Sequence, residues 1–165
     1  MAALIVVVLA VVVLFGFVVW LGPPYLPTMK TQVDTALDLL DLKPGQTMLE
    51  LGSGDGRVLL AAAKRGWNVV GYEVNPILVF VSWVITWRYR KQVQVIWGNM
   101  WQKVWPPADG IFTFLLDRYM PKLDKKITQT YKSKSIKLVS FAFEMPDKPK
   151  KIEKNGIFLY HYHKS

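Results

Sequence analysis

Short apolar runs alternate with amphipathic stretches along most of this chain. The runs at residues 48–51, 68–72, 93–97 and 110–116 have the length of buried strands, and the stretches between them are long enough for helices. Nearly continuous apolar strands separated by helices are typical of a parallel sheet that is covered on both faces. The pattern therefore predicts an α/β fold with a mostly parallel sheet.

Helices are predicted between and before these strands, at residues 31–42, 57–65, 77–90 and 122–131. A fifth strand is predicted at residues 136–143. The last segment, residues 150–163, predicts an antiparallel hairpin, because Asn155-Gly156 is the strongest short hairpin signal. His161 and His163 lie on one face of its second strand without the further ligands that a metal site needs, so no metal site is predicted.

The first 22 residues contain no charged side chain. As a helix they would be about 33 Å long, enough for the hydrocarbon core of a bilayer. A cleaved signal peptide is the competing interpretation, but the segment lacks a basic start and its apolar run is longer than is typical of such peptides. Trp20 and Tyr25 stand where interfacial aromatic residues are expected. Residues 1–22 are therefore predicted to be an uncleaved transmembrane anchor.

A proline-rich connector, residues 23–30, follows the predicted anchor and reaches at most about 28 Å. Residues 31–165 form the predicted globular domain, which the short connector would hold close to the bilayer. The formal net charge of +9 lies wholly after residue 22. The positive-inside rule then places the domain on the cytoplasmic side of a single-pass membrane protein.

Residues 122–165 carry eleven lysines and four acidic residues. Such a surplus is typical of a surface that meets an anionic membrane, of a solvated lysine-rich face, or of a nucleic-acid site. Because no RNA-binding motif accompanies it and an anchor is predicted nearby, the bilayer is the expected partner and nucleic acid the least favoured. The chain has no cysteine, which excludes disulfides, thiolate metal sites and cysteine nucleophiles.

The most informative stretch is the turn L-G-S-G-D-G-R at residues 51–57, between a predicted strand and a predicted helix. Gly52, Gly54 and Gly56 permit positive φ and let backbone N–H groups approach a ligand. Glu73 closes the next strand 21 residues after Gly52, which is the spacing of an acid that meets a ribose. This βαβ unit predicts a nucleoside-containing ligand.

The rest of the turn narrows the choice of nucleoside. A dinucleotide fingerprint needs glycine where Arg57 stands, and a P-loop needs a Gly-Lys-Ser/Thr ending that is absent. Glu50, just before the turn, suits a cationic amine better than a pyrophosphate. These residues resemble motif I of the class I S-adenosylmethionine-dependent methyltransferases, an acid-x-G-x-G-x-G pattern followed by a distal acid. The resemblance implies a Rossmann-like class I sheet and S-adenosyl-L-methionine as the cofactor.

The resemblance also implies roles for individual residues. Glu50 would meet the methionine amine of the cofactor, and Glu73 its ribose hydroxyls. An acid is usual where Asn99 stands, but an amide can also bond an adenine edge. The implied cofactor-binding residues are Glu50, Gly52, Ser53, Gly54, Gly56, Glu73, Asn75 and Asn99.

Candidate catalytic residues follow the fourth predicted strand. Ligands of open α/β sheets bind outside the carboxyl ends of the strands, so residues just after this strand would face the transferred methyl group. Asp117 and Tyr119 occupy this place. The Asn/Asp-Pro-Pro-Tyr sequence of adenine and glutamine amide methyltransferases is absent here, which disfavours methylation of nucleobase amino groups.

The order of the segments P-Y-L-P-T, L-G-S-G-D-G-R, G-Y-E-V-N-P and D-R-Y-M-P-K-L-D-K-K resembles a smaller group. This group comprises the membrane-anchored lysine methyltransferases that act on the ATP synthase c-subunit and the adenine nucleotide translocase. The resemblance implies methylation of lysine in a membrane protein, at a bacterial plasma membrane or a mitochondrial inner membrane. The alternatives are a lipid headgroup amine or quinone precursor as acceptor, and an anchored scaffold without turnover.

Overall fold

The computed structural model describes residues 1, 4–6, 8–9 and 28–164. The predicted anchor, residues 1–22, and most of the predicted connector lie largely outside this part of the chain. Among the described residues, no helix is both long and apolar enough to cross a bilayer. The sheet and the helices that cover it come from residues 30–162.

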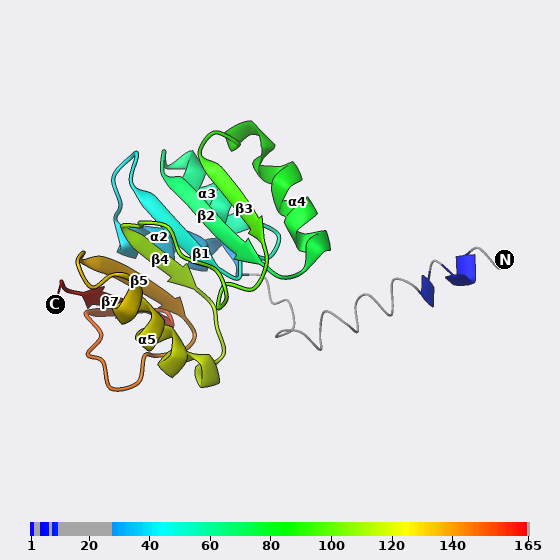
Figure 1. The fold of residues 1–165 in the computed structure, drawn as a ribbon. Coiled ribbons are helices and arrows are strands. Elements are labelled where there is room, and N and C mark those ends of the chain that lie inside the picture. Colours follow the sequence, from blue (N-terminus) through cyan, green and yellow to red (C-terminus); the bar gives the residue numbers. More distant parts are fainter. Residues whose placement is uncertain (2–3, 7, 10–27, 165) are drawn as a thin grey trace.

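Seven strands form one sheet in the order β3-β2-β1-β4-β5-β7-β6 (Figure 1). Strands β3, β2, β1, β4 and β5 are parallel, while β7 runs antiparallel to both β5 and β6. The prediction of a mostly parallel sheet that ends in an antiparallel hairpin is thus confirmed. The strands are β1 (Thr47–Leu51), β2 (Asn68–Glu73), β3 (Val93–Trp97), β4 (Gly110–Thr113), β5 (Ile136–Phe141), β6 (Ile152–Lys154) and β7 (Ile157–Tyr162).

Among the described residues, four helices cover the sheet, three on one face and one on the other, and Figure 1 shows them on its two sides. Helices α2 (Lys30–Leu40), α3 (Arg57–Lys64) and α4 (Pro76–Thr86) share one apolar core, to which β1 contributes Met48. Helix α5 (Met120–Thr130) covers the opposite core, to which β1 contributes Leu49. Successive strand residues point to opposite faces, so each strand serves both cores and its sequence stays apolar throughout.

Several element ends differ from the sequence prediction for local reasons. Strand β4 ends at Thr113 because its partner Leu51 is the last residue of β1 before the glycine turn. Strand β5 ends at Phe141, since Ala142 adopts a φ of 68°. The helix predicted at residues 77–90 divides into α4 and a 3₁₀ turn, η1 (Trp87–Tyr89).

The hairpin between β6 and β7 turns where the sequence predicts it. Asn155 and Gly156 both have positive φ, at 53° and 72°. A two-residue turn of this kind matches the right-handed twist of the flanking strands. The predicted Asn-Gly turn is therefore confirmed.

The strand order reverses between β1 and β4. The connection from β1 leads to β2 on one side, whereas the chain returns after β3 to place β4 on the other side of β1. In open α/β sheets this reversal leaves a crevice outside the carboxyl ends of the central strands. The glycine turn follows β1 at that end of the sheet.

Candidate functional site

The glycine turn between β1 and α3 is built by positive φ angles and by hydrogen bonds to β2. Gly52, Gly54 and Gly56 have φ values of 88°, 55° and 83°. The N–H groups of Gly52 and Ser53 both donate to the Tyr72 carbonyl oxygen, at 3.0 and 2.9 Å. A side chain in the left-handed region costs roughly 1–2 kcal/mol, so glycine is the favoured residue at these positions.

Glu73 at the end of β2 fastens the turn to the start of α4. Its Oε2 accepts from the N–H of Gly54 at 2.9 Å, and its Oε1 accepts from the N–H of Asn75 at 2.8 Å. Asn75 in turn caps α4, because its side-chain oxygen accepts from the N–H groups of Ile77 and Leu78. A carboxylate has about four lone-pair sites, so Glu73 keeps acceptor capacity for a further donor.

Two other close approaches leave no room for larger residues around the turn. A Cβ on Gly56 would lie 2.1 Å from Ser82 Oγ in α4. A Cβ on Gly71 in β2 would lie 2.9 Å from the Ser53 Cβ and 2.8 Å from a Leu59 methyl. The contact at Gly56 therefore packs the turn against α4, and the contact at Gly71 packs it against β2.

Buried polar atoms without a partner gather around this turn. Among the described residues, Glu50 Oε2, Ser53 Oγ and Ser82 Oγ are buried and make no hydrogen bond. Buried polar groups are normally satisfied, so the free Glu50 oxygen just before the turn indicates a place where a polar ligand supplies the missing partner, whereas Ser82 is packed against Gly56. A Cβ built on Gly52 meets nothing within 4 Å, so the surface of the turn is open there. The residues present thus fit a small polar ligand that carries hydrogen-bond donors.

Glu50 carries the strongest electrostatic perturbation of this site. Burial raises the pKa of its carboxyl well above the usual 4.5, and the nearby charges of Asp55 and Glu73 raise it further. A hydrogen bond from the Leu59 backbone acts in the opposite direction. A bound ammonium would reverse this balance, because an opposite charge favours the ionised carboxylate.

We expect Glu50→Gln to raise the unfolding free energy of the ligand-free protein at pH 7 by about 0.5–2 kcal/mol, the range of typical stabilising substitutions. Because the folded pKa of Glu50 is raised, the folded state binds the extra proton, and wild-type stability falls as pH rises above 4.5. Glu50→Gln has no carboxyl to ionise, so its unfolding free energy does not fall in this way, and the difference from the wild type should vanish near pH 4. Urea unfolding from pH 4 to pH 8 measures it, with the exposed Glu153→Gln as the control. If Glu50→Gln were less stable than the wild type at pH 7, the raised pKa of Glu50 would not be what limits stability there.

Asn99, Trp101 and Tyr119 form a connected series beyond the end of β2. The N–H of Gly98 donates to the Glu73 carbonyl oxygen at 2.8 Å, so Asn99 follows β3 directly beside the end of β2. The exposed Asn99 holds the next turn, since its Oδ1 accepts from the N–H of Trp101 at 2.9 Å. The Trp101 ring then lies 6.1 Å from the Tyr119 ring. This series of contacts joins the ends of β2 and β3 to the segment after β4.

Asp117 and Tyr119 lie on a short 3₁₀ turn, η2 (Asp117–Tyr119), that leads into α5. Asp117 is exposed and Tyr119 is half-buried. Two cations stand over the aromatic rings here, with the Arg118 guanidinium 4.9 Å from the Tyr119 ring centre and the Lys122 ammonium 4.6 Å from that of Trp101. The segment thus combines one exposed carboxylate with aromatic rings under positive charge.

The loop that carries Trp101 is held by a lysine that the sequence did not single out. The Lys126 ammonium donates to the carbonyl oxygens of Met100, Trp101 and Lys103 at 2.9–3.0 Å. It also lies 4.8 Å from the ring centre of buried Trp105. Trp105 therefore packs in the core, whereas Trp101 stays at the site.

The structure brings the candidate residues together in two groups. Glu50, Ser53, the three glycines of the turn, Glu73 and Asn75 form one connected cluster, and Asn99 adjoins it. Asp117 and Tyr119 form the second group, on the turn after β4, where Tyr119 lies beside Trp101. Sequence reasoning missed Thr28, whose carbonyl oxygen accepts from Arg57 Nη1 at 3.2 Å and so brings the end of the connector to α3. It also missed Ser82 and Lys126, because both act through contacts that are distant in sequence.

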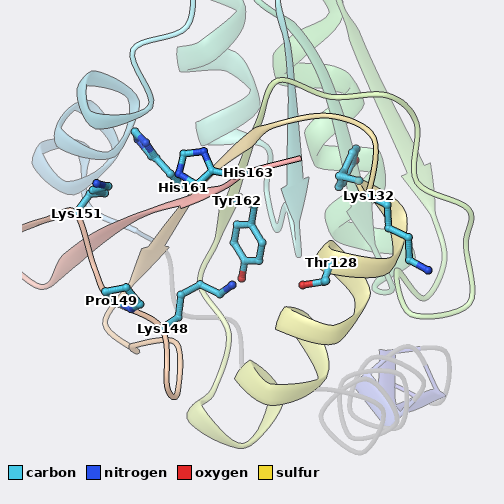
Figure 2. Close-up of a pocket in the computed structure, with 9 residues that line it drawn as sticks. Thr128, Lys132, Lys148, Pro149, Lys151, His161, Tyr162 and His163 are labelled. Carbon is cyan, nitrogen blue, oxygen red and sulfur yellow. The ribbon is translucent and has the colours of Figure 1, made fainter. Parts of the chain in front are cut away.

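The basic hollow in Figure 2 is separate from this site. It is lined by the end of α5, the loop before β6 and the last residues of β7, including Lys132, Lys148, Lys151, His161 and His163. His161 pairs with Lys137 at the start of β5, so the hollow lies at the end of the sheet opposite the glycine turn. The rings of His161 and His163 are 6.3 Å apart.

Comparison with known proteins gives consistent matches. A family model of the ANTKMT methyltransferase domain matches residues 50–151. A lysine N-methyltransferase of the ATP synthase c-subunit from Xenopus laevis is 33% identical over 126 residues, which cover 75% of this chain and 55% of that protein. An adenine nucleotide translocase lysine N-methyltransferase from Mus musculus is 32% identical, over 74% of this chain and 54% of that protein. The chain spans about half the length of the curated relatives it matches.

A solved structure also matches most of the chain. The RNA methyltransferase from Salinibacter ruber, in complex with S-adenosyl-L-homocysteine, has a TM-score of 0.75 and 26% sequence identity. The match covers 83% of this chain and 92% of that one. The predicted class I arrangement of the sheet is therefore confirmed.

Proposed function

Because the chain belongs to the ANTKMT methyltransferase domain family, we propose that it is an S-adenosylmethionine-dependent N-methyltransferase that modifies a lysine of a membrane protein. The observation that carries this proposal is the intact glycine turn. Its unpartnered Glu50, Ser53 and Ser82 atoms surround a backbone that Glu73 holds in place. A scaffold that had lost turnover would not need to preserve this arrangement.

The cofactor would be held by the cluster after β1, β2 and β3. Glu50 would receive the methionine ammonium, which supplies the donor that its buried oxygen lacks. Glu73 would accept from the ribose hydroxyls with the lone pairs that Gly54 and Asn75 leave free. Gly52 and Gly54 would border the amino acid end of the cofactor, and Asn99 its adenine.

When bound, S-adenosylmethionine supplies a methyl group on a positively charged sulfur. A neutral lysine amine would form the new N–C bond as the C–S bond breaks, which would leave the electron pair on sulfur and give the neutral thioether S-adenosyl-L-homocysteine. The methylated ammonium would then release its proton to water. A free lysine has a pKa near 10.4, so only about one in a thousand is neutral at physiological pH. The site must therefore favour the neutral amine and align it with the methyl group.

The segment after β4 has residues that could favour the neutral amine and align it with the methyl group. Asp117 would attract the lysine ammonium as it enters, and Tyr119 would orient the nitrogen lone pair. Arg118 and Lys122 lie over the Tyr119 and Trp101 rings. Because like charges disfavour the charged form of an entering amine, these cations would promote loss of its proton.

The proposed anchor, residues 1–22, would place this site at a membrane surface. The connector meets the domain at Thr28, which Arg57 fixes beside the glycine turn. The site and the start of the tether thus lie at the same end of the domain. We propose a single-pass protein with its domain on the cytoplasmic side, in a bacterial plasma membrane or the equivalent side of a mitochondrial inner membrane.

Methyl transfer from radiolabelled S-adenosylmethionine into membranes of a strain that lacks the gene tests the proposal. We expect label in a small hydrophobic protein, recovered as methyl-lysine after hydrolysis, and expect Asp117→Ala to lower turnover while it retains cofactor affinity. Label in extracted lipid would show that the methyl acceptor is a headgroup amine or a quinone precursor and not lysine. Label in RNA would favour the chemistry named for the Salinibacter ruber protein. Cofactor binding without label in any fraction would indicate a scaffold.

A further inference from the structure

Helix α4 buries two polar residues and leaves most of its large apolar residues exposed. Its buried side consists of Val79, Ser82 and Thr86, and the Thr86 hydroxyl donates to the Ser82 carbonyl oxygen. Its outer side joins Trp97 from the end of β3 to form one apolar surface, which we call the α4 face. The large side chains of this face are 46–63% exposed and comprise Ile77, Phe80, Trp83, Val84, Trp87 and Trp97.

The α4 face has no counterpart in an ordinary surface helix. A helix that covers a sheet normally keeps its apolar stripe toward the core and its charges toward water. From Pro76 to Trp87 the sequence has no charged residue. Soluble monomers rarely expose contiguous apolar patches of this kind, and such patches mark interaction sites.

Two of the three tryptophans of this face, Trp83 and Trp97, are oriented by hydrogen bonds. Trp83 Nε1 donates to the Val95 carbonyl oxygen at 3.3 Å, and Trp97 Nε1 donates to that of Val74 at 3.0 Å. The polar atom of each indole is thus satisfied within the protein while the ring remains exposed. Tryptophan is enriched at the boundary between lipid and water, where an apolar ring meets headgroups.

The charges around the α4 face favour an anionic lipid surface. Residues 74–108 contain no acidic residue, whereas Arg88, Arg90 and Lys91 follow the helix directly. The Arg90 guanidinium lies 5.0 Å from the Trp87 ring centre. An apolar helix face flanked by basic residues is the pattern of helices that lie in the plane of a membrane interface.

The lysine-rich C-terminal part is less suited to that role. Five of its eleven lysines are engaged within the protein, by backbone carbonyls or by carboxylates. They are Lys126, Lys134, Lys137, Lys148 and Lys150.

Helix α4 also lies close to the point where the connector enters, which it approaches with its buried side. Thr28 is bound by Arg57 at the start of α3, and the preceding residue, Gly56, packs against Ser82 of α4. A short tether from a bilayer would therefore bring α4 near the lipid surface. Only the nearness of α4 to the lipid surface rests on the proposed anchor, because the composition and exposure of the α4 face do not depend on it.

We propose that the α4 face lies in the interface of an anionic bilayer, with its tryptophans and Phe80 among the upper acyl chains and Arg88, Arg90 and Lys91 at the headgroups. The domain then binds the membrane along the helix as well as through its tether. Helix α4 then contacts lipid with its outer side and the glycine turn with its buried side.

Tryptophan quenching by brominated acyl chains tests this proposal in the full chain. The protein, carrying Trp20→Phe to remove the tryptophan of the proposed anchor, is placed in single-copy nanodiscs of phosphatidylcholine and phosphatidylglycerol, with or without dibrominated lipid. We expect strong quenching, reduced at least twofold by Trp83→Phe/Trp87→Phe/Trp97→Phe. These replacements keep the face apolar, and Trp67 and Trp105 stay buried in the core.

A second variant changes the face and keeps its fluorophores. Phe80→Ser/Val84→Ser should lower the quenching at least twofold, whereas Ile152→Ser, an exposed apolar position on β6 at the opposite sheet edge, should not. Equal quenching with and without the three tryptophans would overturn the proposal. Shielding of these tryptophans from aqueous iodide without quenching by lipid would instead indicate a protein cover, either a second copy or another part of this chain. No methyl transfer is measured, so this result is independent of the proposed enzyme activity.

Discussion

Replacing Gly56 with alanine will lower the unfolding free energy of the domain by about 2–5 kcal/mol and abolish measurable cofactor binding. The left-handed conformation at Gly56, with φ of 83°, accounts for roughly 1–2 kcal/mol of this loss. The remainder is steric, because the new Cβ would lie 2.1 Å from Ser82 Oγ and 3.1 Å from the Ser82 Cα. The backbone of α4 or of the turn must move, and the geometry of the site moves with it.

Gly45→Ala is the matched control for this variant. Gly45 has φ of 85°, but a Cβ there meets nothing within 4 Å. It should therefore show only the conformational loss, roughly 1–2 kcal/mol, and retain cofactor affinity. Denaturant unfolding and calorimetric binding of S-adenosyl-L-homocysteine measure both effects. Equal losses of stability in the two variants would show that the contact between Gly56 and Ser82 is unimportant.

Glu73→Ala will weaken cofactor binding by roughly 2–3 kcal/mol, which corresponds to a roughly 30- to 160-fold higher Kd. The variant loses the acceptors proposed for the ribose hydroxyls. It also releases the N–H groups of Gly54 and Asn75, which the carboxylate now holds at 2.9 and 2.8 Å. Hydrogen bonds to a charged acceptor are about twice as strong as neutral ones, so the turn should become less ordered as well.

Glu73→Gln separates these contributions, because it keeps the shape and one acceptor oxygen but loses the charge. We expect an affinity between those of the wild type and Glu73→Ala. Calorimetric titration with S-adenosyl-L-homocysteine gives the affinities, and Glu153→Ala on the exposed hairpin is the control. If Glu73→Ala bound the ligand as tightly as the wild type, the ribose would have to be held by other residues.

Local sequence signals predicted the parts of the fold that depend on local geometry. The glycine turn is determined by Gly52, Gly54 and Gly56, which supply the positive φ angles observed there. The hairpin is determined in the same way by Asn155 and Gly156. The spacing to Glu73 also placed its carboxylate at the turn, although its bonds to Gly54 and Asn75 were not anticipated. Whether the candidate site residues bind the cofactor stays a prediction.

Features that depend on distant contacts could not be predicted. The apolar pattern of residues 77–90 predicts a helix but not which side of it faces outward, because apolar residues occupy nearly every position. The inward side is set by the close approach of Gly56, which requires a residue as small as Ser82. The role of Lys126 likewise depends on carbonyl groups 23–26 residues away in the chain.

Lys126 also bears on whether the proposed methyl transfer could modify a lysine of the protein itself. Its three hydrogen bonds to the carbonyl oxygens of Met100, Trp101 and Lys103 use all three N–H groups of the ammonium. A nitrogen held in this way has no lone pair to attack a methyl group. Burial and the charge of Lys122 lower the pKa of Lys126, but its three carbonyl partners hold the nitrogen in the loop beside Trp101, so we expect Lys126 itself to stay unmethylated in the proposed reaction.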